Sequence, residues 1–451
     1  MDPSKARLVE GPVGRQLVGM TLPMLLGIAT MMGQAFIDTW FIGQVGDREL
    51  AAYGFGFPIL MIITSVAIGL GAGTSSVVAR AIGSGNQSRT KRLATDSLIL
   101  SFLITAVIAV IGVFTIRPLF LLLGAPEDMI PMLKVFMTIL YVGVPFVVAG
   151  MVSMATMRAT GDTRLPSKLM IGGAILNVVL DPILIFGFGP IPALGLYGAA
   201  FAGLIARGTV FFVGLYILVY RIDMVSFKLP HFDEIKRSWT DILHVGLPAA
   251  GTNAIVPVGT ALVTAMIARF GPEAVAGFGV ASRIESLMLV IYYAMSSIIG
   301  PFVGQNLTAL KEDRIHLALK LSAWFCVGSG LAIAVILALL SDFLPGLFSD
   351  SEEVQNVTRL FLLIAPISYG AYGIVMVMNA SFNGLGKPMP GVWVSLVRIL
   401  VLYVPLAVLG MRYFGVTGIF VAYAAANIVT GLLALVWAEK VVHAQCRSQL
   451  S

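Results

Sequence analysis

The sequence contains little charge, few cysteines and few histidines, and each shortage narrows the possible functions. Only 12% of the 451 residues are charged, about half the share found in a soluble globular domain. Cys326 and Cys446 are the only cysteines, and their predicted positions are too far apart for a disulfide. The intervals between the four histidines do not match the spacing typical of metal ligands. These residues are His231, His244, His316 and His443. We therefore expect no large soluble domain, no disulfide framework and no histidine-based metal cluster.

Apolar residues dominate instead, at 58% of the chain. They form twelve long stretches. Each reaches the length of about 20 apolar residues that a helix needs to cross a bilayer. The first stretch is too long for a signal peptide, so we expect it to be retained. These observations predict an all-α polytopic membrane protein with twelve transmembrane helices. The expected stretches are 17–43, 50–79, 93–123, 130–157, 165–189, 194–220, 240–269, 274–304, 315–347, 357–382, 389–410 and 414–438.

Lysine and arginine predict the orientation of these helices. The loops on the side of the N-terminus, with both termini, carry twenty of them, and the opposite loops carry six. Cytoplasmic loops are enriched in these residues. Both termini are therefore expected in the cytoplasm. The net charge of +6 follows from this topology, and no nucleic-acid partner is needed to explain it.

The two halves of the chain form a repeat at a shift of about 225 residues. VGMTLP around Pro23 matches VGLP around Pro248, and GDRELAAYG from Gly46 matches GPEAVAGFG from Gly271. At a slightly shorter shift, GLYGAA from Gly195 matches GVTGIF from Gly415. Six helices per copy place both copies in the same direction, which predicts pseudo-symmetry about the membrane normal and a substrate route at their interface. The expected divisions are an N-terminal lobe over 1–220, a cytoplasmic linker over 221–239 and a C-terminal lobe with a short tail over 240–451.

Two aspartates lie inside predicted membrane helices. Asp38 follows Pro23 within stretch 17–43, with Gln34 one helical turn before it. Asp181 stands in LNVVLDP, where Asn177 precedes it by one turn and shares its helix face. An aspartate near the centre of such a helix costs about 2.5–3.5 kcal/mol on insertion scales, so these residues are candidates for function.

Both aspartates are expected at similar depth, in the outer half of the membrane, where they could line one pocket. Two carboxylates close together in a medium of low dielectric constant can hold a proton near neutral pH, or bind Na⁺ when both are ionised. In a purely structural interpretation, each aspartate satisfies neighbouring hydroxyls or backbone groups that a proline leaves free. The functional interpretation is favoured for both.

Other polar and flexible residues are weaker candidates. Arg283 and Glu285 lie two residues apart and point in different directions from their helix, so we expect no pair between them. A structural bridge and a gating role both remain open for them, while Arg207 and Arg398 are assigned structural roles. Methionines can adapt to ligands of different shape. The candidate substrate pocket accordingly includes Gln34, Met31, Met151 and Met154.

Several motifs together resemble the multidrug and toxic compound extrusion (MATE) family, over essentially the whole chain. They are the helix from Pro23 to Asp38, VARAIG at 78–83, MRATGDTRLP at 157–166, LNVVLDP at 176–182, PFVGQN at 301–306 and NGLGKP at 383–388. The resemblance implies two pseudo-symmetric six-helix lobes, a fold shared with the wider MOP flippase superfamily. It also implies a cleft that alternates between the membrane faces while H⁺ or Na⁺ moves inward and a drug moves out.

Within the family, the sequence looks most like the DinF-like branch. Asp38, Asn177 and Asp181 match that branch's cation-coupling positions, and Pro23 matches the proline where its first helix bends. The NorM-like branch uses acidic residues in spans seven and ten, whereas the interiors of both spans lack an acidic residue in this chain. Gly203 stands where many members have a threonine, which removes a hydroxyl ligand for Na⁺. Met151 and Met154 replace amides seen in relatives, which predicts a more apolar pocket.

The sequence therefore predicts a secondary active multidrug efflux transporter that exports amphipathic, mostly cationic compounds in exchange for H⁺, with Na⁺ as the other possible coupling ion. No catalytic activity, cofactor or firm metal site is expected; Na⁺ would bind at Asp38, Asn177 and Asp181. We expect a monomer in the cytoplasmic (inner) membrane. A lipid-linked precursor flippase of the same superfamily is the alternative. An intramembrane aspartyl protease is a weaker one, because LDP around Asp181 lacks the GxGD pattern.

Overall fold

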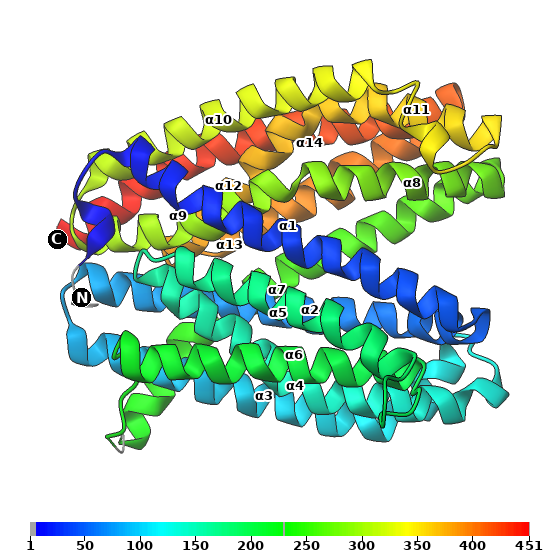
Figure 1. The fold of residues 1–451 in the computed structure, drawn as a ribbon. Coiled ribbons are helices and arrows are strands. Elements are labelled where there is room, and N and C mark those ends of the chain that lie inside the picture. The colour runs from blue at the N-terminus through cyan, green and yellow to red at the C-terminus, as the bar shows by residue number, and fades with distance from the viewer. Residues whose placement is uncertain (1–5, 229–230, 451) are drawn as a thin grey trace. The chain divides into compact units, whose positions relative to one another are not determined.

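The computed structural model describes residues 6–228 and 231–450, the last two as backbone only. Lys5, which counts toward the predicted orientation, and residues 229 and 230 of the predicted linker lie outside this part. The described residues are almost entirely helical, and their extended pairing is a single bridge between Phe188 and Ile191. The all-α prediction is confirmed. The main helices are α1 Val13–Val45, α2 Asp47–Gly83, α3 Gln87–Leu122, α4 Ile130–Ala159, α5 Arg164–Ile185, α6 Leu196–Tyr216, α7 Phe232–Ile267, α8 Pro272–Met288, α9 Val290–Thr308, α10 Glu312–Leu339, α11 Glu352–Ile364, α12 Tyr369–Gly384, α13 Met389–Leu396 and α14 Val404–Leu450 (Figure 1).

These helices agree with twelve membrane spans. In the described part of the chain, ten helical segments are long and apolar enough to cross a membrane, and α8 with α9, bent by 43°, makes an eleventh. The longest segment, Met389–Ser448, contains a break at Gly415, where two helices meet at φ 59° and ψ −140°. Dividing it there gives twelve. Some observed helices extend beyond the predicted stretches, as in Val13–Val45 against 17–43, because polar ends of a helix carry no hydropathy signal. Others end earlier, as at Ile185 against 189 and at Leu339 against 347.

The chain forms two compact lobes. The first comprises Met1–Arg7 and Leu22–Ala250, and the second comprises Leu8–Thr21 and Gly251–Ser451. The boundaries inside the two long helices α1 and α7 lie beside prolines of the repeat, Pro23 and Pro248. The predicted division at segment 221–239 stays a prediction; α7 begins inside that segment, at Phe232.

Each lobe is built around one buried helix. In the first lobe, α4 packs against α2, α3 and α6, and α5 packs against α6 (Figure 1). In the second lobe, α12 packs against α9, α10 and α14, while α8 packs against α11. The central helices α4 and α12 belong to matching positions of the sequence repeat, because each contains or completes the fourth span of its half.

The repeat is also visible in the backbone conformation. Gly195 and Gly415 adopt nearly the same unusual conformation, with φ 55° and ψ −131° at the first and φ 59° and ψ −140° at the second. Gly161 and Gly386 have φ of 84° and 72°. The loops after α2 and α9 share a positive φ as well, at Gly85 and at Leu310. Few residues other than glycine adopt this conformation, so its recurrence at matching positions indicates two copies of one fold.

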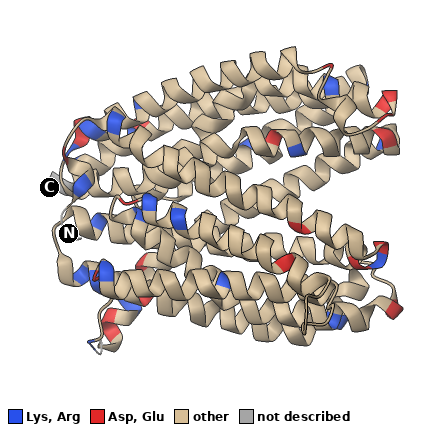
Figure 2. Ribbon diagram, in the orientation of Figure 1, with Lys and Arg blue, Asp and Glu red and all other residues tan. Residues whose placement is uncertain are grey.

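Charged residues gather toward the ends of the helices (Figure 2). The long apolar middle sections leave few places for them, since a charge in the hydrocarbon core is costly. The pattern supports a multi-pass membrane protein, and the cytoplasmic placement of the termini stays a prediction.

Close helix packing in the second lobe depends on Gly330, which predicts a stability effect. A Cβ atom at Gly330 of α10 would lie 2.4 Å from the backbone nitrogen of Gly370 in α12, whereas one at Gly328 would meet nothing within 4 Å. Gly330→Val is therefore expected to destabilise the protein by about 2 kcal/mol through overpacking, seen as a lower midpoint of thermal unfolding in detergent. Gly328→Val carries the same change of helix propensity and should leave that midpoint nearly unchanged. Equal midpoints for the two variants would contradict this packing.

Candidate ion-coupling site

The two predicted aspartates come together in the first lobe. Asp38 projects from α1 and Asp181 from α5, and Asn177 lies between them. The Asn177 side-chain amide donates a hydrogen bond to Asp181 Oδ2 over 2.9 Å and approaches Asp38 Oδ1 at 3.3 Å. The structure thus brings together the three residues predicted for cation coupling.

Gln34 completes the contacts of Asp38. Its side-chain amide donates to Asp38 Oδ2 over 3.2 Å, one helical turn along α1. Asp38 therefore accepts from one amide on its own helix and from another on α5. This arrangement fixes the direction of the carboxylate.

One oxygen of Asp181 is left for a proton or an ion. The Asp181 side chain is 1% exposed, and its Oδ1 is buried without a hydrogen-bond partner. The carboxyl groups of Asp181 and Asp38 meet at the Asn177 amide, which contacts both of them. Two ionised carboxylates close together repel each other, so a proton on one group or a cation between them would stabilise the pair.

Both aspartates border a small cavity of about 40 Å³. A water molecule needs about 10–15 Å³ of such space, while sites for drug-sized ligands measure about 300–1,000 Å³. The cavity can therefore hold water or a small cation, and a drug would need another site. Its polar lining consists of Asp38, Tyr53, Asn177, Asp181 and Arg207.

The cavity includes Tyr53, which the sequence did not single out, and Arg207, for which the sequence predicted no part in the site. Arg207, on α6, interacts electrostatically with both aspartates, although its sequence context favoured a structural role. One sequence signal was available: Arg207 follows Gly203 by one helical turn, and Gly203 was already noted for its missing hydroxyl. The structure places Gly203 in the cavity wall, where an added Cβ would lie 3.7 Å from Asn177 Oδ1.

A second contact joins α5 to α1 near the proline. The Ser167 hydroxyl donates to the Pro23 carbonyl over 2.5 Å. The helices are closely packed here, because a Cβ on Gly27 would lie 3.2 Å from Ser167 Cα. Helix α5 therefore holds α1 at its proline through Ser167 and at its carboxylate through Asn177.

The methionines predicted for the substrate pocket do not line this cavity. Met154 is buried in the apolar core of the first lobe and Met151 packs against that core, whereas Met31 on α1 is exposed. Their part in substrate binding stays a prediction.

The second lobe contains the other predicted polar candidates. Glu285 on α8 accepts a hydrogen bond from the Tyr423 hydroxyl over 2.7 Å, and Arg283 is exposed. Among the described residues, Arg283 and Glu285 form no ion pair with each other. This agrees with the prediction that two side chains two residues apart on a helix point in different directions. Arg398 stacks over the Tyr372 ring at 4.4 Å and donates to Asn427 Oδ1 over 3.1 Å.

Comparison with known proteins identifies the family. The family model described as MatE matches residues 23–183 and matches again over residues 248–409. Together the two matches cover well over half of the chain, and their starts are separated by the length of the sequence repeat. The chain belongs to the MATE family. Its two-lobe fold, predicted from the repeat, is the fold of that family.

Similar proteins agree with this assignment. The FAD transporter of Shewanella oneidensis is 38% identical to this MATE protein over 434 residues, which are 96% of each chain. The probable multidrug resistance protein YoeA of Bacillus subtilis is 26% identical over 443 residues, which are 95% of each chain. The Vibrio cholerae MATE transporter VcmN, solved in its bent form, has a TM-score of 0.92 and 32% identity, with 96% of this chain and 98% of that chain covered. This protein is therefore a transporter, which argues against the protease alternative.

Proposed function

We propose that this MATE protein exports organic compounds across the cytoplasmic membrane in exchange for protons, with Asp38 and Asp181 as the coupling pair. The observation that carries the proposal is the meeting of these two carboxyl groups at the Asn177 amide, together with the buried Asp181 oxygen that has no hydrogen-bond partner. Intramembrane carboxylates of this kind commonly form proton relays in pumps and transporters.

The charges around the cavity favour the uptake of one proton. Two ionised aspartates and the Arg207 guanidinium give the cavity a net charge of −1, which one proton neutralises. A neutral cavity is much less costly in the membrane than a charged one. Protonation also changes the hydrogen bonds around α1, because a protonated carboxyl group donates where it previously accepted.

Sodium is less well accommodated. A hard cation is bound by several oxygen ligands, and here the aspartates and Asn177 can supply them, while Gly203 supplies none. Arg207 adds a positive charge that repels Na⁺ electrostatically. We therefore favour H⁺ over Na⁺ as the coupling ion.

A bend of α1 at Pro23 is the proposed link between protonation and the conformational change. Pro23 removes a backbone hydrogen bond from α1, and the contacts from Ser167 and Asn177 connect this helix to α5. A proton on Asp38 weakens the amide contacts at one end of this connection, so the helix can change its path at Pro23.

Two substrate classes are proposed. Amphipathic, mostly cationic drugs agree with the relatives that are named multidrug resistance proteins. FAD is the second candidate, because the relative named an FAD transporter is 38% identical over nearly the whole chain. A lipid-linked precursor would be the cargo in the flippase alternative.

Both termini are proposed to be cytoplasmic, with the protein acting as a monomer in the inner membrane.

Everted vesicles in Na⁺-free buffer can test this function. After an inside-acid proton gradient is formed, addition of ethidium is expected to release protons, because the drug enters the vesicle as protons leave. A parallel experiment replaces ethidium with FAD and also measures FAD inside the vesicles. Vesicles without the protein give the background.

The outcomes separate the candidates. Proton release by ethidium supports the multidrug proposal, and release accompanied by FAD uptake supports flavin export. A response that requires Na⁺ would contradict proton coupling. No response to either compound would contradict both substrate proposals and move attention to a lipid cargo.

A further inference from the structure

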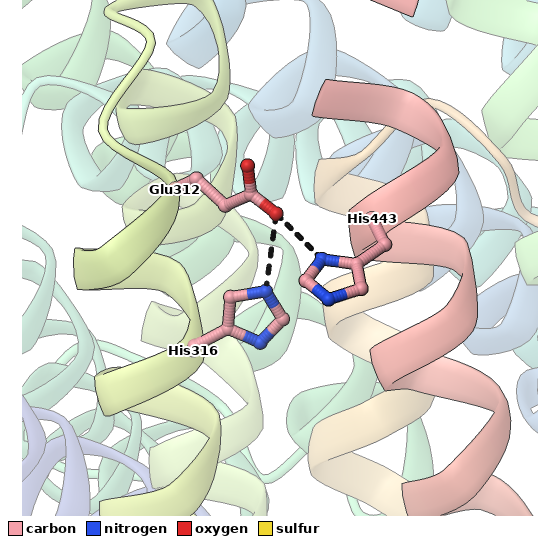
Figure 3. A group of neighbouring side chains, drawn as sticks. All are labelled: Glu312, His316 and His443. Atoms are coloured by element: carbon pink, nitrogen blue, oxygen red, sulfur yellow. Dashed lines mark hydrogen bonds and ion pairs between the residues drawn. The ribbon is translucent and has the colours of Figure 1, made fainter. Parts of the chain in front are cut away.

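A group of side chains of the types that ligate metals lies in the second lobe, on other helices than those that carry the aspartate pair. Glu312 and His316 project from the first turns of α10, and His443 projects from α14 near its C-terminal end (Figure 3). Glu312 Oε1 lies 2.6 Å from His443 Nδ1 and 3.4 Å from His316 Nε2. The sequence contained one signal, the spacing of four between Glu312 and His316, whereas His443 joins them only in the folded chain.

The geometry of the three ligand atoms suits a small divalent ion. All three atoms lie within 4.8 Å of one another. A tetrahedral ion with bonds of about 2.1 Å holds neighbouring ligand atoms about 3.4 Å apart. Small rotations of the side chains would therefore bring the carboxylate and both imidazoles into bonding distance, and water would occupy the remaining position.

The chemical types of the three ligands indicate which metal ions the group would bind. Two imidazoles and one carboxylate favour Zn²⁺ and neighbouring divalent transition ions over Mg²⁺ or Ca²⁺, which prefer oxygen ligands. The side chains are also accessible, with exposed fractions of 30% for His316, 35% for Glu312 and 65% for His443. An ion can reach them from solvent without opening the apolar core.

We propose that Glu312, His316 and His443 form a binding site for a divalent transition-metal ion of the Zn²⁺ type. Two ligands lie one helical turn apart at the start of α10, and the third comes from α14. A bound ion therefore ties the C-terminal helix to α10 and stabilises the second lobe, since a ligand that binds only the folded form shifts unfolding in its favour. This role is independent of the transport proposal.

Zinc titration of the full chain tests the site. The protein is purified in detergent, freed of any affinity tag and treated with a chelator, and ZnCl₂ is then added in a calorimeter. We expect one saturable Zn²⁺ per chain and a higher midpoint of thermal unfolding with the metal. Cobalt offers a second probe, because tetrahedral coordination by imidazoles and a carboxylate gives Co²⁺ a visible absorption much more intense than that of the hydrated ion.

Variants identify the ligands. His443→Ala and His316→Ala are each expected to weaken Zn²⁺ binding at least about tenfold and to abolish the thermal shift. His443→Gln can keep a hydrogen bond to Glu312 and controls for loss of folding. His231→Ala changes an exposed histidine outside the group and should bind Zn²⁺ like the intact protein.

Two results would overturn the proposal. One is the absence of saturable Zn²⁺ binding at micromolar concentrations, which would leave the group as hydrogen-bonded side chains only. The other is unchanged binding in folded His443→Gln and His316→Ala, because the ion would then be bound elsewhere.

Discussion

Asp38→Asn is expected to reduce substrate-driven proton release to the level of vesicles that lack the protein. The amide has nearly the same shape as the carboxylate, but it cannot exchange a proton at neutral pH. The change also leaves one aspartate beside Arg207, so the cavity is already neutral and has no charge for a proton to remove. Fluorescence of a pH indicator in everted vesicles measures the effect.

A matched substitution outside the cavity controls this experiment. Asp128→Asn changes an exposed aspartate of the first lobe, whose side chain is 72% exposed and pairs with Arg48. Exposed ion pairs contribute little to stability, so this variant should retain full proton release. Normal proton release by Asp38→Asn at normal expression would rule out the proposed coupling, whatever the substrate.

Gly203→Thr is expected to make transport dependent on Na⁺. The new Cβ would meet Asn177 Oδ1 at 3.7 Å and Arg207 Nη1 at 3.8 Å, which are ordinary contacts, so the side chain fits beside the aspartates. Its hydroxyl adds an oxygen ligand to a cavity that contains two carboxylates and an amide. We expect Na⁺ to stimulate substrate uptake by at least about tenfold, since one added hydrogen-bonding or coordinating group commonly contributes 1.5–3 kcal/mol, roughly, when it contacts a charge.

Gly203→Val separates the hydroxyl from the added volume. Valine and threonine have nearly the same shape, so a change caused by crowding would appear in both variants. Substrate uptake is measured in proteoliposomes with Na⁺ or with choline outside. Equal Na⁺ responses in the threonine and valine variants would show that residue 203 does not contribute a ligand.

The sequence determined the class of protein because its main signals are local or repeated. Apolar stretches identify membrane helices without knowledge of their neighbours, since the lipid surrounds each of them. The match between Pro23 and Pro248 likewise required only a comparison of the chain with itself. Asp38 and Asp181 stood out individually because a carboxylate in an apolar helix is costly.

The sequence predicted only some of the side chains that surround Asp38 and Asp181. The spacing of four residues placed Gln34 beside Asp38 and Asn177 beside Asp181, and the structure retains both contacts. Arg207 comes from another helix, and its side chain could as well have served a structural role. Its position beside the aspartates depends on how α6 packs in the first lobe, which no local pattern encodes.

The group of Glu312, His316 and His443 shows the same limit more clearly. The sequence alone gave a helix turn with Glu312 and His316, and it placed His443 more than a hundred residues later without an indication of its neighbours. Only the packing of α14 against α10 brings the third ligand to the first two. Local composition and spacing thus determined the helices, the repeat and the buried carboxylates, whereas contacts between helices decided which side chains share a site, because those contacts depend on packing between distant parts of the chain.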